Sequence, residues 1–341
     1  MRFSTTFAIL LALVASSTAT AEDLTLSTWK TTRLNDVFYS EGAGVGDFNK
    51  DGKTDVVSGP FWYAGPDFKK RHVYYEPKPF NPLGYSDNFF AYSEDFNGDG
   101  WEDILIIGFP GKDASWFENP QGKDRFWTRH KVFDTVDNES PQYVDLTGDG
   151  RREIVCSTGG VFGFIEPNRV APEKPWKFRP ISGKATGGRF VHGLGIGDVN
   201  GDGRADLLEK SGWWEQPASL NGDPAWKKHP VQFSGPGGAQ MFAYDFDGDG
   251  DNDVLTSLAA HGFGLAWYEQ TKGDDGIAFE QHLITGKTPG ENRYGVAFSE
   301  LHGVDLVDMD GDGLKDIVTG KRYWSHGPGK SDHFDRNDPP V

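Results

Sequence analysis

Six copies of an acidic loop recur along the chain, beginning 47 to 63 residues apart. Each copy places oxygen-bearing side chains at positions one, three and five, Gly at six and a carboxylate at nine. Ca²⁺ takes six to eight oxygen ligands at roughly 2.3–2.6 Å, and the EF-hand's Glu at position twelve and flanking helices are absent here. We therefore predict structural calcium sites, whereas the alternative is a set of acidic turns without metal. The predicted ligands are Asp47, Asn49, Asp51, Asp55; Asp95, Asn97, Asp99, Asp103; Asp145, Thr147, Asp149, Glu153; Asp198, Asn200, Asp202, Asp206; Asp245, Asp247, Asp249, Asp253; and Asp308, Asp310, Asp312, Asp316.

Three histidines, each followed by Gly, depart from the repeat pattern. His192 and His302 stand six residues before the first Asp of their loops, and His261 follows a predicted strand. Three imidazoles with one open position form a site for Zn²⁺ or another divalent metal, which polarises a carbonyl or acidifies water. We therefore predict that these three residues are catalytic and approach one another. The alternative is a polar channel whose side chains are bridged by water.

Carboxylates and cations are predicted around the same site. Glu41 and Glu139 share the repeat position of His192, and Glu300 lies close in sequence to His302, so these carboxylates are candidate bases. Lys321 and Arg322 follow a predicted strand, where they are expected to hold a carboxylate or an enediolate. The chain has no serine nucleophile motif, phosphate-binding loop or dinucleotide fingerprint, which disfavours those chemistries. By contrast, His130, His229 and His282 recur at the same repeat position and are expected to be structural. No pattern in the sequence suggests a role for His72 or His333.

The elements that must position these residues are short strands. Each acidic loop precedes an apolar, β-branched run and then an aromatic segment and a strand carrying His, a four-stranded unit with the period of a propeller blade. We predict an all-β propeller of six such units, with a seventh left open. If the acidic loops lie at one face of the propeller, the three histidines are expected at the opposite face. The segment Trp29–Leu34 matches an outer strand without a blade of its own, so we expect it to close the ring. Alternatively, Trp29 belongs to a flexible leader.

The first 21 residues have the character of a signal peptide, with Arg2, an apolar core and the small residues Ala19 and Ala21 around the expected cleavage site. The remaining residues 22–341 are predicted to be one domain that is secreted or periplasmic, without a membrane span. The net charge of −17 disfavours nucleic acid and anionic membranes as partners. Cys156 is the only cysteine, so no internal disulfide can form.

The loops and their flanking residues resemble FG-GAP or VCBS-type repeats, best known from the propeller of integrin α subunits. Ser299-Glu300-Leu301-His302, Trp267-Tyr268-Glu269 and the segment 319–324 are more similar to exported bacterial propellers related to the propeller domain of aldos-2-ulose dehydratase. That resemblance implies a seven-bladed ring and a metal-assisted lyase or dehydratase acting on keto-sugars. The predicted function is thus a calcium-binding propeller that acts on carbohydrate. The alternative is a non-catalytic module that binds a glycan, another small molecule or a protein.

Overall fold

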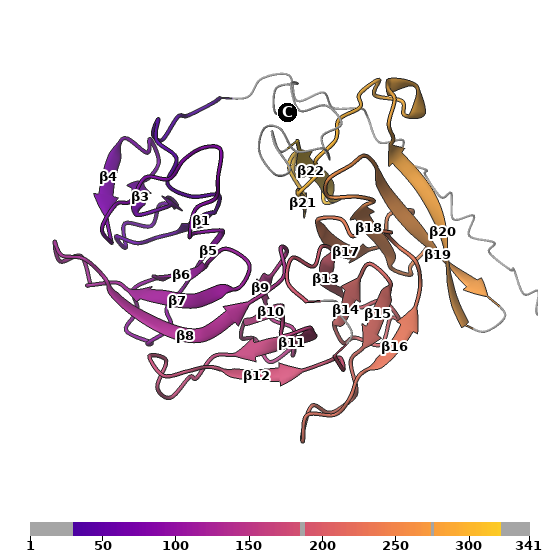
Figure 1. The fold of residues 1–341 in the computed structure, drawn as a ribbon, viewed down its shortest axis with the longest axis horizontal. Helices are drawn as coiled ribbons and strands as arrows, with labels where there is room; N and C mark the ends of the chain where they lie inside the picture. The colour runs from indigo at the N-terminus through magenta and orange to yellow at the C-terminus, as the bar shows by residue number, and fades with distance from the viewer. Residues whose placement is uncertain (1–29, 185–187, 274–275, 322–341) are drawn as a thin grey trace, which may run out of the picture. The chain divides into compact units, whose positions relative to one another are not determined.

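The computed structural model describes residues 30–184, 188–273 and 276–321 of the 341-residue chain. The chain separates into a unit Met1–Arg33 and a unit Leu34–Val341, and the second holds all the strands described below (Figure 1). Residues 30–33 are exposed and form no strand. The outer strand expected over 29–34 is therefore absent from its described part, and Trp29 lies outside the described residues. Closure by this segment stays a prediction.

Five consecutive four-stranded antiparallel units make up most of the second unit, as the repeat pattern predicts (Figure 1). The first two comprise β1 (Ala43–Gly46), β2 (Asp55–Ser58), β3 (Phe61–Ala64), β4 (Lys70–Val73); and β5 (Phe90–Glu94), β6 (Asp103–Ile107), β7 (Lys112–Glu118), β8 (Thr128–Val136). The third comprises β9 (Gln142–Val144), β10 (Glu153–Thr158), β11 (Val161–Glu166), β12 (Lys177–Pro180). The fourth and fifth comprise β13 (Leu194–Gly197), β14 (Asp206–Glu209), β15 (Gly212–Glu215), β16 (Lys227–Pro230); and β17 (Gln240–Tyr244), β18 (Asp253–Ser257), β19 (Leu265–Gly273), β20 (Gly276–Thr285).

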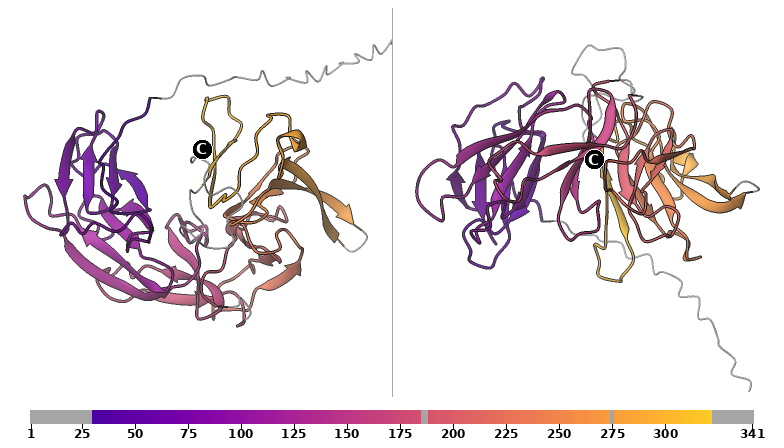
Figure 2. Two further views of the ribbon diagram at one scale, coloured as in Figure 1. Left: turned by 45° about the horizontal axis from the view of Figure 1, so that its top comes forward. Right: turned by 90° about the horizontal axis from the view of Figure 1, so that it is seen from below.

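The last described strands, β21 (Gly303–Val307) and β22 (Asp316–Gly320), form a two-stranded sheet, preceded by the short 3₁₀ helix η1 (Pro289–Glu291). The longest hairpin is β19–β20, whose strands run side by side in both views of Figure 2. The described residues thus contain five complete units and half of a sixth.

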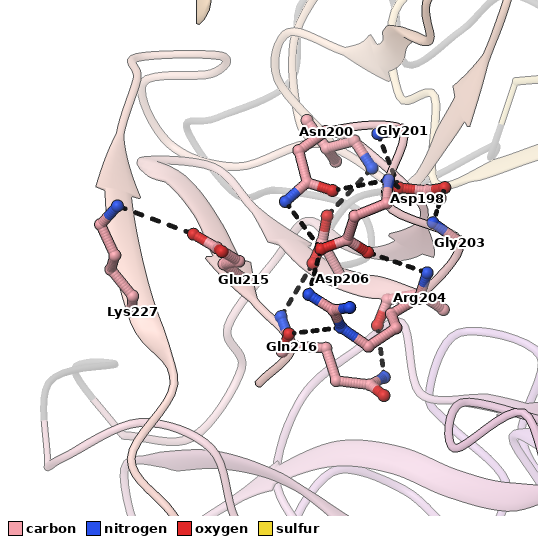
Figure 3. Close-up of polar contacts among 12 residues, drawn as sticks. Asp198, Asn200, Gly201, Gly203, Arg204, Asp206, Glu215, Gln216 and Lys227 are labelled. Atoms are coloured by element: carbon pink, nitrogen blue, oxygen red, sulfur yellow. Dashed lines mark hydrogen bonds and ion pairs between the residues drawn. The ribbon is translucent and has the colours of Figure 1, made fainter. Parts of the chain in front are cut away.

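Each acidic loop joins the first and second strands of its unit, and its carboxylates bind the backbone of the turn. In the fourth loop, Asp198 accepts hydrogen bonds from the N–H groups of Asp202 at 3.1 Å and Gly203 at 2.8 Å (Figure 3). Asp206, at position nine, is fully buried and accepts from Val199 N–H at 3.0 Å and Gln216 N–H at 2.8 Å. This carboxylate therefore ties the loop to the end of the third strand.

Glycines let the first strands of neighbouring units approach closely. A Cβ on Gly44 of β1 would lie 2.5 Å from the carbonyl oxygen of Ala91 in β5, and one on Gly195 of β13 would lie 2.1 Å from that of Met241 in β17. The strands β13 and β17 are paired in parallel, which joins the fourth and fifth units into one eight-stranded sheet. Because His192 lies two residues before β13, this pairing holds its segment against the fifth unit.

Large aromatic and aliphatic side chains fill the space between successive units. Phe48 and Trp62 of the first unit pack with Ile104 and Phe117 of the second, for example. Four units also pack a Trp of the third strand against a His of the fourth, and the rings are stacked in three of them and tilted in the Trp116–His130 pair. His130, His229 and His282 were expected to be structural, whereas no role was predicted for His72. The centroid distances are 3.9 Å for Trp62–His72, 4.4 Å for Trp116–His130, 4.0 Å for Trp213–His229 and 4.5 Å for Trp267–His282.

Candidate metal centre

Four side chains from four different units converge at the strand ends opposite the acidic loops. Glu139 precedes β9, His192 precedes β13, His302 precedes β21, and His261 follows β18. Each offers one ligand atom, and these four atoms all lie within 4.8 Å of one another. The structure thus brings together the three histidines singled out by their repeat positions and adds one carboxylate.

The distances within this group are those of a compact polar cluster. Glu139 Oε2 lies 3.1 Å from His192 Nε2 and 3.9 Å from His302 Nε2. The ring of His261 lies 4.9 Å from that of His192 and 4.7 Å from that of His302, centroid to centroid. The side chains of His192, His302 and Glu139 are 13%, 15% and 18% exposed. The side chains are thus only slightly exposed, and the candidate ligand nitrogens of His192 and His302 are buried within the cluster.

The donor set suits a first-row transition metal. Imidazole nitrogens are good ligands for Zn²⁺, Cu²⁺, Fe²⁺ and Ni²⁺, and three protein ligands plus an open position are typical of catalytic zinc sites. Glu139 can serve as a fourth ligand or, if it remains uncoordinated, as a base beside the metal. Ca²⁺ fits poorly, since it prefers an all-oxygen shell.

Backbone contacts hold the histidine segments in place. Glu139 N–H donates to the carbonyl of Val191, the residue before His192, at 3.0 Å. Gly237 packs against His192 so closely that a Cβ there would lie 2.7 Å from the His192 Cβ and 2.3 Å from its carbonyl oxygen. Because Gly237 also has φ +101°, glycine is required at this position.

The turn before His302 has an unusual conformation. Glu300 is buried and has φ +64°, a left-handed conformation that non-glycine residues seldom adopt. Its N–H donates to the carbonyl of Gly262 at 2.9 Å, and its own carbonyl accepts from His302 N–H at 2.9 Å. Residues held in such conformations cluster at functional sites. This turn links the segment of His261 to that of His302, although the Glu300 carboxylate is not one of the four grouped side chains.

The other residues predicted around the histidine site are placed differently. The carboxylate of Glu41 accepts from Ser86 N–H at 3.2 Å and also contacts Ser86 Oγ, and Glu41 is not part of the group of four. Lys321 is buried directly after β22. Arg322 lies outside the described residues.

An aromatic cluster occupies equivalent repeat positions in the second unit. Phe89, six residues before Asp95, and Phe109, just after β6, lie 5.2 Å apart, centroid to centroid. Tyr85 packs on both, and Phe190, two residues before His192, packs on Phe109 at 5.5 Å. Phe190 is 44% exposed, so this cluster presents an aromatic face to solvent. Phe89 stands at the repeat position of Glu139 and His192, and Phe109, like His261, follows a second strand, whereas nothing in the sequence indicated Tyr85 and Phe190.

A cavity of about 610 Å³ lies among the first strands of several units, and none of the four grouped side chains lines it. It is lined by first strands of several units and includes Pro141, two residues after Glu139, and Gly303, directly after His302. The side chains of Gln142 and Gln240 contribute polar groups to its wall. Its volume is in the range of small-molecule pockets, about 300–1,000 Å³.

The acidic loops form a second class of candidate metal site. In the fifth and sixth loops the carboxylates at positions one, three and nine offer ligand atoms within 4.8 Å of one another: Asp245, Asp247, Asp253; and Asp308, Asp310, Asp316. At position nine, burial raises the pKa of Asp103 to about 8 and that of Asp206 and Glu153 to about 7. Neighbouring carboxylates also raise these pKa values, so a bound cation would relieve both effects. Calcium binding stays a prediction.

Comparison with known proteins supports the repeat assignment. Residues 95–156 match a family model for the FG-GAP-like repeat. No curated protein matches the chain. Among solved structures, the crystal structure of the V. cholerae biofilm matrix protein Bap1 is similar with a TM-score of 0.38 and 15% identity; the match covers 71% of this chain and 40% of that one. None of these findings supports the closer resemblance to aldos-2-ulose dehydratase.

A search of the described residues finds no helix that is both long and apolar enough to cross a membrane.

Proposed function

We propose that this FG-GAP-like repeat protein is an exported, metal-dependent enzyme acting on carbohydrate, and that Glu139, His192, His261 and His302 form its active centre. The observation that carries the proposal is the convergence of four ligand atoms within 4.8 Å from residues 139 to 302 of the chain. A repeat fold needs no such cluster for stability, because the second and fifth units hold Phe89 and Ala239 at the position of Glu139, His192 and His302.

The reaction class that fits best is elimination from a keto-sugar or a uronic acid. A bound divalent metal would supply a Lewis acid that polarises the substrate's carbonyl group. Glu139 is then placed to take the proton from the adjacent carbon, since its carboxylate lies among the three imidazoles. The C–H electron pair forms the new double bond, the neighbouring C–O bond breaks, and the departing oxygen takes up a proton.

The aromatic face formed by Tyr85, Phe89, Phe109 and Phe190 supports a carbohydrate substrate. Aromatic rings offer apolar faces on which the C–H faces of sugar rings can pack. The cavity of about 610 Å³, whose lining includes Gly303 next to His302 in the sequence, provides room for one or two sugar rings.

A product screen tests this proposal. Protein loaded with Zn²⁺ or Mn²⁺ is incubated with keto-sugars and with uronic acid polysaccharides, and unsaturated products are followed by absorbance and mass spectrometry. We expect turnover that is lost in His302→Ala and in Glu139→Gln. If the metal binds but no substrate class yields an eliminated product, the centre is not a lyase, and a metal-containing binding module replaces this proposal.

A further inference from the structure

A second cavity, of about 1,000 Å³, lies between the first and second units and is strongly basic. Its wall includes Lys70 and Arg71 of β4 and Lys123 and Arg125 of the loop between β7 and β8, and we call these four residues the basic groove. Trp62, with His72 stacked on it, and Phe126, which is 53% exposed, supply aromatic faces. Asp124 is the only carboxylate in the lining. No residue of the candidate metal centre lines this cavity.

The cations of the basic groove are not neutralised by the protein. Within the described part of the chain, none of the four makes an ion pair, and Arg71 instead lies over the ring of Phe61 at 4.2 Å. This is unexpected in a chain with a net charge of −17. Four unpaired cations around one cavity favour an anionic ligand.

A cavity between the third and fourth units provides an internal comparison. It too is lined by arginines, and two of the three, Arg169 and Arg179, are paired with carboxylates. Arg179 lies 2.6 Å from both Glu166 and Asp223, and Arg169 lies 2.6 Å from Glu94. Exposed cations are therefore not a general consequence of how two units meet.

The first unit lacks the glutamate that ends the third strand of the fourth unit. In the fourth unit, Glu215 faces Lys227 across the β15–β16 pair and lies 3.7 Å from it (Figure 3). Glu215 also contacts His229 at 2.7 Å. In the first unit the same register pairs Ala64 with Lys70. The first and fourth units thus share the Trp–His stack and the lysine, but the first unit has alanine in place of the glutamate. Lys70 therefore has no carboxylate partner across the strand pair and lines the cavity.

We propose that the basic groove binds an anionic carbohydrate chain, one that carries sulfate or carboxylate groups, at a site separate from the metal centre. Lysine and arginine of the groove contact the anionic groups, and the exposed ring of Phe126 and the edge of the Trp62–His72 stack contact sugar rings. The groove would anchor a polymer to the protein irrespective of any reaction at the metal centre.

Binding is measured by isothermal titration calorimetry at low and moderate salt. The probes are a sulfated tetrasaccharide, an oligogalacturonate, a neutral cello-oligosaccharide and a single-stranded DNA oligonucleotide of similar charge. We expect saturable binding of at least one anionic oligosaccharide, weakened by salt, and none of the neutral one. The sulfated and carboxylated probes distinguish the two kinds of anion.

Two variant pairs locate the site. Lys70→Ala/Arg125→Ala should weaken binding at least tenfold, whereas Lys174→Ala/Lys184→Ala, which removes two exposed lysines elsewhere, should change it less than twofold. Ala64→Glu restores the carboxylate of the other units and should weaken binding about tenfold, while the neutral Ala64→Gln should not. Thermal melting confirms that each variant is folded.

Three results would overturn the proposal: no binding of any anionic oligosaccharide, equal affinities of Ala64→Glu and Ala64→Gln, or tighter binding of the DNA than of the oligosaccharides. The metal-centre variant His302→Ala separates this proposal from the proposed function. It should bind the oligosaccharide with unchanged affinity, and loss of binding in this variant would assign the ligand to the metal centre instead.

Discussion

A buried amide side chain ties the third unit to the fourth, and its removal should destabilise the protein measurably. Gln216 is 4% exposed, and its Nε2 donates to the carbonyl of Leu146 at 2.9 Å, from the third acidic loop, and to that of Ala205 at 2.7 Å. Gln216→Leu keeps the volume but removes both donors. Each of the two carbonyls that loses its donor costs about 1–3 kcal/mol, so the free energy of unfolding should fall by about 2–6 kcal/mol.

The assay is urea unfolding followed by tryptophan fluorescence. The matched control is Gln281→Leu at an exposed position of β20, which should change the free energy of unfolding by less than about 0.5 kcal/mol. Asn119 makes the equivalent link in the second unit, donating to Phe48 at 3.0 Å and Glu102 at 2.9 Å. Its alanine variant should lose a similar amount, additively with Gln216→Leu. A Gln216→Leu protein as stable as its control would refute the view that these amides join the units.

Three further outcomes are expected. Removal of Ca²⁺ with EGTA should lower the melting temperature by many degrees, because the metal-free loops crowd their carboxylates; an unchanged melting curve together with no bound calcium would show that the loops are plain turns. In the calcium-free protein, the pKa values of Asp103 and Asp206 are raised to about 8 and about 7, so these carboxylates bind more protons in the folded state than in the unfolded state. The free energy of unfolding should therefore fall as the pH rises from about 5 to 8. An increase over this range would contradict the raised pKa values. Burial raises the pKa of the Cys156 thiol, so a thiol reagent should label it only after denaturation, and rapid labelling of the native protein would contradict its burial.

The four-stranded units could be predicted because their signals are local and repeated. Each acidic loop marks the turn between two strands, and the following apolar run becomes the buried second strand, as in β6. Ring closure depends instead on contacts between distant segments.

The grouping of the histidines follows from repeat positions, because equivalent residues of successive units lie at the same strand ends. Repeat position does not specify individual partners. Glu41 and Glu139 occupy the same position, yet Glu41 binds Ser86 of the neighbouring segment, whereas Glu139 lies against His192. No role was predicted for His72 because the first unit departs from the pattern of the others, with Ala64 in place of the usual glutamate.

The central claim is that Glu139, His192, His261 and His302 hold a transition metal. The most direct measurement is the transition-metal content of the purified protein, stripped and then reloaded with Zn²⁺ in the presence of excess Ca²⁺, by mass spectrometry of the elements. We predict one tightly bound equivalent per chain, lost in His302→Ala while calcium-dependent melting is unchanged. Absence of bound transition metal in the parent protein, or full retention of it in His302→Ala, would contradict the claim.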